Sequence, residues 1–331
     1  MKNIYVLLLS ALSLCFFSYC TNGKKTDNKV KLEVKVLRLD RDLQTLTSEN
    51  LPLVRERYGV FFELFNTTII NIGNSESSLY FDMLGNFLRH DIVQEAYKET
   101  ARVFSNDELL DKQFSEGLTN MAAYFPDMTV PKIVTYISGF NEALILTDSV
   151  IGVGLERFLG GDYALYAQLG LSNYMQQKMT PDRLALIAVE AWIASEYFLN
   201  INDENTLLKN MIHEGKLLYV LKQCFPEISD ATLMGYTKAQ YDWCVDHEQK
   251  MWEMLISQKL LYVANEFTIK KFTGEAPYTA DFSSAAPGKA ACWVGYRIVS
   301  NYMKRKSDVT LTALMDEHDL LLILRESRYN P

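Results

Sequence analysis

The sequence predicts an α+β protein that is mainly α-helical and carries a small antiparallel sheet. Apolar residues recur at three- and four-residue spacing through most of the chain, which is typical of helices with one buried face. Two runs, 132–140 (KIVTYISGF) and 149–153, are the main β-rich segments after residue 130. No repeat of constant period occurs, so a solenoid is not expected. With 331 residues, 48% hydrophobic and 22% charged, the composition is that of a globular protein.

The first 19 residues have the features of a secretory signal peptide. Lys2 precedes an uncharged stretch whose apolar core, IYVLLLSALSLCFF, is shorter than the ~20 residues needed to span a bilayer. The stretch ends at Cys20, and the polar segment TNGKKTDNK follows. We predict that Cys20 becomes the lipidated (palmitoylated) N-terminus of a bacterial lipoprotein and that residues 20–30 form a flexible tether.

Two features complicate this prediction. Tyr19 stands where a small residue usually precedes the lipidated cysteine. Cys15 is an alternative, but further apolar or small residues follow it. The expected location is the cell envelope, with the lipid in the outer membrane.

Residues 31–130 are expected to be the helical first part of a single domain that spans residues 31–331. The alternation in Val30–Leu39 predicts a strand. A helical region then extends to about Phe65, and Ser77–Phe125 has the pattern of three further helices.

The second part, residues 131–331, begins with the predicted antiparallel pair of strands, which the turn Gly160-Gly161-Asp162 closes. The glycines match neither GxGxxG nor GxxxxGK[ST], which argues against nucleotide binding. The net charge of −8, or −9 after loss of the leader with its single Lys2 (−8 − 1), argues against nucleic acid as a partner.

Several long helices are predicted after the sheet. Thr180 and Pro181 provide an N-cap and a first-turn proline for a helix to about Leu199. Another helix is predicted from about Lys238 to Val263, and a third opens at Pro287. Cys224, Cys244 and Cys292 lie in apolar helical segments, so we interpret them as buried thiols.

The helix predicted over Thr206–Cys224 resembles the metal-binding helix of zinc peptidases but is incomplete. His213 and Glu214 match the start of HExxH, but Leu217 replaces the second histidine. His247 and Glu248 fail in the same way, since Met251 stands four residues after His247. Because Glu214 lies beside the apolar stripe that includes Tyr219, it needs a partner or a proton.

The helix that opens at Pro287 places Arg297 on one face with Trp293 and Ile298. An arginine on such a face either extends to the solvent or pairs with a carboxylate, for which Glu214 and Glu248 are the candidates.

Five runs of residues, all after Val153, have a recognisable pattern: FLGGDYALYAQLGLSNYM, MIHEGKLLYVL, YTKAQYDWCVDHEQKMWEMLI, AAPGKAACWVGYRIVSNYM and SRYNP. In these runs the chain resembles the gliding motility-associated lipoprotein GldB family of the Bacteroidota. This resemblance implies an envelope lipoprotein associated with gliding and with secretion machinery.

A fainter resemblance links the second part of the chain to gluzincin-type zinc peptidases. In those enzymes an HExxH helix is followed by a helix with Glu-Gly and then a helix with Gly-Tyr; here Glu214-Gly215 and Gly295-Tyr296 occupy the later two places. In the first place the chain reads Val189-Glu190-Ala191-Trp192-Ile193, without histidines. The resemblance implies a degenerate zincin-like scaffold over the C-terminal two-thirds that retains the general-base position, Glu190, but no zinc.

We therefore expect a non-catalytic envelope lipoprotein with no cofactor, bound to a membrane by its lipid and to a protein or peptide partner. The groove would lie between the strand Lys132–Phe140 and the helix at 180–199, with strand addition as the mode of binding. The alternatives are an atypical zinc metallohydrolase that uses Glu214 with His213 or His247, and a surface glycan-binding lipoprotein, suggested by the 19 tyrosines. The candidate cleft residues are Glu190, His213, Glu214, Tyr219, Glu248, Tyr296 and Arg297.

Overall fold

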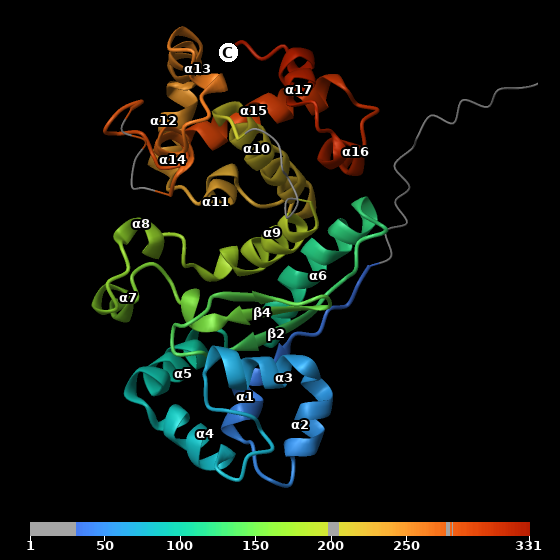
Figure 1. Ribbon diagram of the computed structural model, residues 1–331, viewed down its shortest axis with the longest axis vertical. Coiled ribbons are helices and arrows are strands. Elements are labelled where there is room, and N and C mark those ends of the chain that lie inside the picture. The colour runs from blue at the N-terminus through green and yellow to red at the C-terminus, as the bar shows by residue number, and fades with distance from the viewer. Residues whose placement is uncertain (1–30, 198–204, 276–278, 280) are drawn as a thin grey trace, which may run out of the picture.

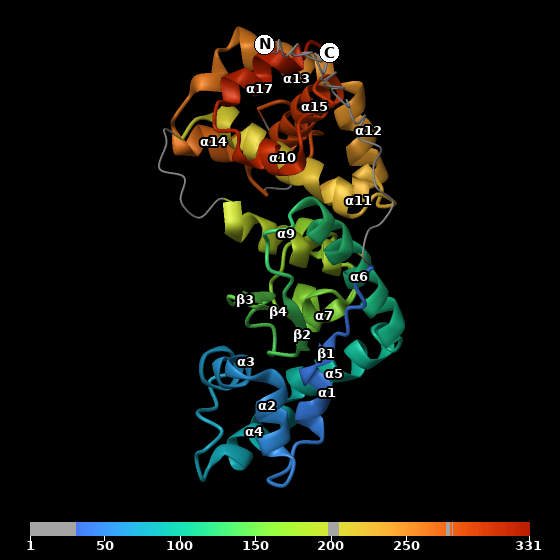
Figure 2. The same ribbon diagram turned by 90° about the vertical axis from the view of Figure 1, so that its right-hand side faces the viewer.

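Helices of the first hundred residues form one end of the molecule, a small sheet lies in the middle, and later helices form the other end (Figure 1, Figure 2). The computed structural model describes residues 31–197, 205–275, 279 and 281–331. The predicted signal peptide, Cys20 and the tether to residue 30 lie outside these residues. Among the helices that the structure describes, none combines the length and the apolar character needed to cross a bilayer. The prediction of a mainly helical α+β protein is confirmed.

The central sheet has four strands in the order β1-β2-β4-β3. They are β1 (Leu37–Arg38), β2 (Lys132–Tyr136), β3 (Leu144–Leu146) and β4 (Val150–Gly154). β1, β2 and β4 are parallel, and β3 is antiparallel to β4. The predicted antiparallel pairing of the two β-rich runs is therefore wrong. β3 and β4 form a hairpin, and this reversal makes β4 run in the same direction as β2.

The two faces of the sheet contact different hydrophobic cores. Along β2, Val134 and Tyr136 face the core formed with the N-terminal helices, and Ile133 faces the larger core shared with the C-terminal helices. In β4, a Cβ atom at Gly152 would lie 2.5 Å from a ring carbon of Phe61. The glycines of the VIGVG run thus make room for aromatic rings in the smaller core.

The N-terminal helices cover the face of the smaller core (Figure 2). They are α1 (Leu39–Gln44), α2 (Leu51–Tyr58), α3 (Val60–Leu64), a π-helical turn (Phe65–Ile69) and α4 (Tyr80–Arg89). α5 (Asp91–Val103) follows, and its buried residues Val93, Ala96 and Tyr97 belong to the larger core. α6 (Asp107–Tyr124) extends beside the sheet towards the other end of the molecule (Figure 2). The predicted helical character of residues 31–130 is confirmed, and β1 is the strand within it.

The segment that precedes β1 is bound to α6 rather than to a sheet. The amides of Leu32, Val34 and Val36 donate to Thr119 Oγ1, Ser115 Oγ and Asp111 Oδ1 at 3.0, 2.9 and 2.9 Å. Two residues of extended chain rise about 6.7 Å and four helical residues about 6 Å, so alternate amides match every fourth helical side chain. The strand predicted from Val30 to Leu39 is therefore confined to β1.

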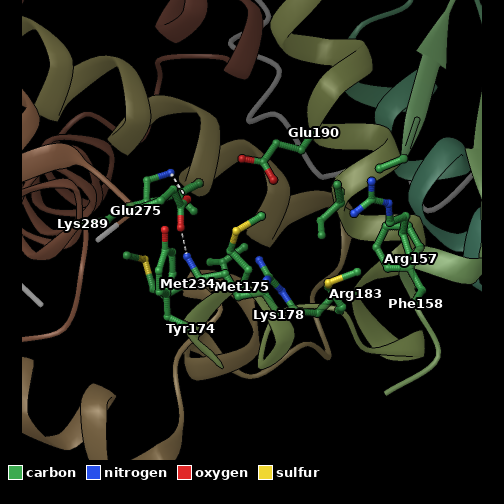
Figure 3. A pocket seen from close by; sticks show the side chains of 15 residues that line it. Arg157, Phe158, Tyr174, Met175, Lys178, Arg183, Glu190, Met234, Glu275 and Lys289 are labelled. Atoms are coloured by element: carbon green, nitrogen blue, oxygen red, sulfur yellow. Dashed lines mark hydrogen bonds and ion pairs between the residues drawn. The ribbon is translucent and has the colours of Figure 1, made fainter. Parts of the chain in front are cut away.

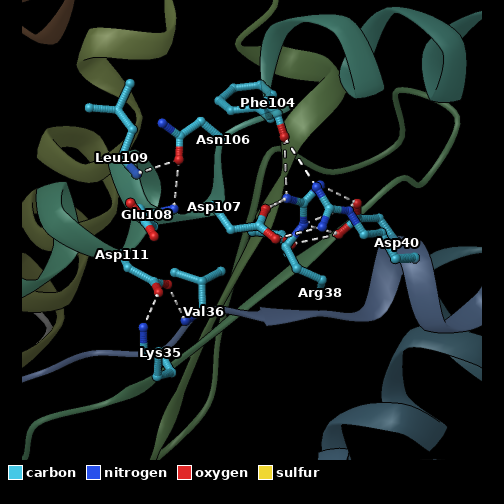
Figure 4. A network of polar contacts seen from close by, with 12 residues as sticks. Lys35, Val36, Arg38, Asp40, Phe104, Asn106, Asp107, Glu108, Leu109 and Asp111 are labelled. Atoms are coloured by element: carbon cyan, nitrogen blue, oxygen red, sulfur yellow. Dashed lines mark hydrogen bonds and ion pairs between the residues drawn. The ribbon is translucent and has the colours of Figure 1, made fainter.

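An ion-pair network fixes β1 against the start of α6 (Figure 4). The Arg38 guanidinium pairs with Asp40 at 2.7 Å and with Asp107. Asp40 also accepts a hydrogen bond from Thr135 Oγ1 of β2 at 2.6 Å. These contacts connect β1, α6 and the centre of the sheet.

The remaining helices follow the sheet in sequence. They are α7 (Ala164–Gln168), α8 (Asn173–Gln176), α9 (Leu184–Tyr197), α10 (Leu207–Cys224), α11 (Asp230–Met234), α12 (Lys238–Asp246), α13 (Glu248–Ser257), α14 (Glu266–Thr273), α15 (Ala290–Arg305), α16 (Leu311–Asp316) and α17 (Leu320–Ser327). Three 3₁₀ turns accompany them: Leu155–Arg157, Pro181–Arg183 and Leu260–Tyr262.

Two helix predictions need correction. The helix expected from Lys238 to Val263 is interrupted at His247, whose ring stacks on Trp243 and whose Nδ1 lies 2.8 Å from the Trp243 carbonyl oxygen. The Thr180 side chain forms no capping hydrogen bond, and a 3₁₀ turn containing Pro181 precedes α9. Cys224, Cys244 and Cys292 are buried, as predicted.

α10 and α15 cross at two glycines. A Cβ atom at Gly215 would lie 2.4 Å from the Gly295 carbonyl oxygen, and one at Gly295 would lie 1.8 Å from the Met211 carbonyl oxygen. The two backbones therefore touch directly. The contact lies at the Glu214-Gly215 pair of α10 and the Gly295-Tyr296 pair of α15.

Candidate functional site

Glu214 forms an ion pair instead of standing alone. Its Oε2 lies 2.9 Å from Nζ of Lys289, the residue that precedes α15. Of the two predicted outcomes, a partner or a proton, the structure shows a partner. Within residues 31–197, 205–275 and 281–331, no group of three or more His, Cys, Asp or Glu side chains is placed to hold a metal ion.

Glu248 belongs to a second, separate cluster that anchors the C-terminal segment. Its Oε1 accepts hydrogen bonds from Arg297 Nε at 3.0 Å and from the Tyr329 hydroxyl at 2.8 Å. Of the two carboxylates proposed for Arg297, Glu248 is correct and Glu214 is wrong. The guanidinium also lies 5.7 Å from the centre of the Trp293 ring. This cluster holds the SRYNP terminus against α13 and α15.

Three other predicted residues have contacts in the protein. Tyr219 is partly buried against the larger core, and burial raises its pKa. Tyr296 is buried, which raises the pKa of its hydroxyl to about 12. His213, next to Glu214 on α10, is partly buried and has interactions of its own. None of the three lines the cavity described next.

A cavity of about 400 Å³ lies between the sheet-side segments α8 and α9 and the C-terminal helices α10 and α11 (Figure 3). Glu190 of α9 is the one predicted cleft residue that lines it. Its apolar walls come from Phe158, Met175, Ile187, Leu218, Leu233 and Met234.

Ionisable side chains of both signs also line this cavity. Four are basic (Arg157, Lys178, Arg183 and Lys289) and two are acidic (Glu190 and Glu275), which gives a formal charge of 4 − 2 = +2. Glu275 pairs with Lys178 and lies 3.4 Å from Lys289 Nζ. The second carboxylate on Lys289 is Glu214.

Arg183 and Glu190 are the unpaired members of this set. Arg183 is only 8% exposed, and its Nε and Nη1 have no hydrogen-bond partner in the described structure. Burial lowers the pKa of Arg183 and raises the pKa of the Glu190 carboxyl. Neither makes a hydrogen bond or an ion pair with another described side chain. A charged ligand in the cavity would lie beside an arginine and a carboxyl group that form no ion pair with a described side chain.

The free edge of the sheet is β3 rather than the predicted strand. β2 lies between β1 and β4, so the segment Lys132–Phe140 cannot accept an added strand. In β3, Ile145 is paired opposite Gly152, and Thr147 bonds Val150. By antiparallel alternation, the amides and carbonyls of Leu144 and Leu146 point away from β4. Ala143, which precedes β3, lines the cavity, so the edge and the cavity adjoin.

The sequence did not single out the basic residues of the cavity. Lys178 and Arg183 precede an almost wholly apolar stretch of α9, and Lys289 precedes another in α15. A basic residue at the start of a largely apolar helix could have marked them, because burial of a charge is costly without a partner. Their meeting depends on tertiary packing.

The family comparison agrees with the resemblance in the sequence. The family model described as "Gliding motility protein GldB" matches residues 20–331. No curated protein and no solved structure matches the chain significantly. Because the match covers more than nine-tenths of the 331 residues, the chain belongs to the GldB family of gliding motility lipoproteins.

Proposed function

We propose that the protein is a non-catalytic, lipid-anchored component of the outer membrane that binds an extended segment of another envelope protein. Family membership supports a place in the cell envelope. The observation that carries the binding proposal is the free edge of β3 beside the cavity. Edge strands with unpaired amides and carbonyls accept a further strand, and a neighbouring pocket gives such binding its selectivity.

The β3 edge is suited to strand addition. Leu144, Ile145 and Leu146 are neither fully buried nor fully exposed. Leu144 and Leu146 pack towards the larger core and Ile145 towards the smaller one. The side chains thus stabilise the strand from both faces, and its outer hydrogen-bonding groups stay available to a partner.

Site-specific crosslinking in cells tests this proposal. A photo-crosslinking amino acid at Leu144 of the full-length lipoprotein should form discrete adducts with a partner protein. Leu146→Pro removes an outward amide without removing a bond to β4, so it should abolish those adducts.

The matched control is the same crosslinker at Leu321 of α17, which is 51% exposed and distant from the sheet in sequence. Adducts that are identical at both positions, or that persist with Leu146→Pro, would refute strand addition at β3.

We also propose that the scaffold is a zincin-like peptidase fold that has lost its metal. The support is the order of three helices along the chain, which matches the order in those peptidases: α9 with Glu190, α10 with Glu214, and then α15, which packs on α10. Glu190 and Glu214 are close enough for the charge of Glu214 to raise the pKa of Glu190, after the larger effect of burial. Restoring the motif with Val189→His and Ile193→His should create a site for one zinc per chain, weakened by Glu214→Ala; absence of stoichiometric zinc would refute this ancestry.

The two alternatives have direct tests. A metallohydrolase that uses Glu214 with His213 or His247 requires about one equivalent of zinc in protein purified without added metal, and activity lost in Glu214→Gln. A glycan-binding protein requires tryptophan quenching by soluble glycans. Neither outcome is expected from strand addition.

A further inference from the structure

The buried guanidinium of Arg183 points to an anionic ligand. With Nε and Nη1 unpaired and only 8% of the residue exposed, the side chain has lost water contacts without gaining described hydrogen bonds. Such a group is unfavourable in the empty protein and favourable once an anion binds. Its position is fixed by packing, because Nη1 lies 2.6 Å from where a Cβ atom of Gly235 would stand.

The surrounding charges favour an anion over a cation. Lys178 and Lys289 add positive charge next to Arg183, and the four basic and two acidic lining residues leave a formal +2. Glu275 is already paired with both lysines. Burial raises the pKa of Glu190, which limits its negative charge. A ligand amine would have only Glu190 as an unpaired acidic partner.

The geometry of the sheet fixes which end of a bound peptide reaches these charges. Ala143 lies at the N-terminal end of β3 and lines the cavity. A peptide that pairs with β3 in antiparallel orientation has its C-terminal end at that point, whereas a parallel peptide would bring its N-terminal end. The positive cavity therefore selects the antiparallel orientation.

We propose that the cavity binds the free C-terminal carboxylate of the captured polypeptide, with the Arg183 guanidinium as its main positively charged partner. This inference rests on the proposed strand addition at β3. The last side chain of the ligand is apolar and packs among Phe158, Met175 and Met234, which line the same cavity (Figure 3). The ligand class is thus a protein C-terminus that ends in a residue such as Leu, Met or Phe.

The test is selection from defined peptides by the full-length lipoprotein in nanodiscs. The pool contains N-acetylated nine-residue peptides that end in Leu, Met or Phe, each as the free acid and as the C-terminal amide. We expect the free acids to bind about tenfold or more tightly than the amides, because a hydrogen bond between charged groups is lost in the amide. Arg183→Gln should remove this preference.

Control variants distinguish the loss of the Arg183 charge from a loss of folding. Arg325→Gln changes an arginine of α17 whose side chain is 68% exposed, and it should leave the preference intact. If Arg183→Gln fails to fold, Lys178→Gln provides a second test and should reduce the preference severalfold. Decanoic acid, which offers a carboxylate on an apolar chain without a peptide backbone, serves as a competitor.

Each outcome decides between the proposals. Equal binding of acids and amides, abolished by Leu146→Pro, would overturn the carboxylate inference but retain strand addition. No peptide binding would overturn both. Tight binding of decanoic acid without peptide binding would assign the cavity to a fatty acid and would also overturn the inference.

Discussion

The crossing of α10 and α15 and the cavity beside α9 use neighbouring parts of the chain in opposite ways. At the crossing, Gly215 and Gly295 bring two backbones into contact, and no side chain fits between them. In the cavity, Arg183 and Glu190 keep unused hydrogen-bonding capacity inside a largely apolar space. In the account proposed above, the crossing serves stability, and the cavity sacrifices stability for binding. Substitutions at the crossing should therefore lower the free energy of unfolding, and substitutions of the unpaired cavity residues should raise it.

The largest expected effect is at the crossing. Gly295→Ala places a methyl group 1.8 Å from the Met211 carbonyl oxygen, and helix backbone cannot move aside as a flexible side chain can. We expect a loss of about 3 kcal/mol or more in the free energy of unfolding, measured by urea denaturation.

Gly85→Ala is the matched control, since Gly85 also lies inside a helix. Its Cβ atom would meet only the end of the flexible Arg89 side chain, at 3.0 Å. The gain in helix propensity should leave stability unchanged or raise it by up to about 1 kcal/mol. Equal losses in both variants would show that the crossing is not special.

A smaller effect is expected where the C-terminus is anchored. Tyr329→Phe removes the hydrogen bond to the partly buried Glu248 carboxylate but leaves Arg297 in place. The free energy of unfolding should fall by about 1–2 kcal/mol. Tyr262→Phe, at a residue that is 62% exposed, should change it by less than about 0.5 kcal/mol; a similar loss there would contradict the anchoring role.

The smallest effect is expected at Glu190, and it depends on pH. Burial raises the pKa of Glu190 in the folded state above its unfolded value, so the ionised carboxylate costs stability as pH rises through that interval. Glu190→Gln should therefore be more stable than the wild type at pH 7, by about 1 kcal/mol or less. The difference should vanish below about pH 3.5, where the carboxyl is largely protonated in both states; a difference that is constant with pH would disprove this cause.

The sequence was informative where a single element determines the outcome. The helix over Leu207–Cys224 begins at its Thr206 cap, as its periodicity indicates. For Arg297 the sequence left solvent, Glu214 and Glu248 open, and the structure shows the pair with Glu248. The burial of the three cysteines was likewise inferred from their apolar neighbours in the sequence.

The predictions were wrong where the structure depends on contacts between segments that are far apart in the sequence. The alternation before β1 resembles a strand, but its amides bind side chains of α6, which no local pattern encodes. The order β2-β4-β3 depends on a three-residue strand that is too short to stand out in the sequence. Arg183 and Lys289 line the same cavity although 106 residues separate them in the sequence (289 − 183), so only tertiary packing brings them to one site.

The unfolding free energy of Arg183→Met, with and without a free-acid peptide, tests the central claim most directly. Without peptide the variant should be more stable than the wild type by about 1–3 kcal/mol, because a buried unpaired charge is removed. The peptide should stabilise the wild type and not the variant. A variant that is less stable than the wild type without ligand, or equally stabilised by the peptide, would show that Arg183 serves the fold and not a ligand.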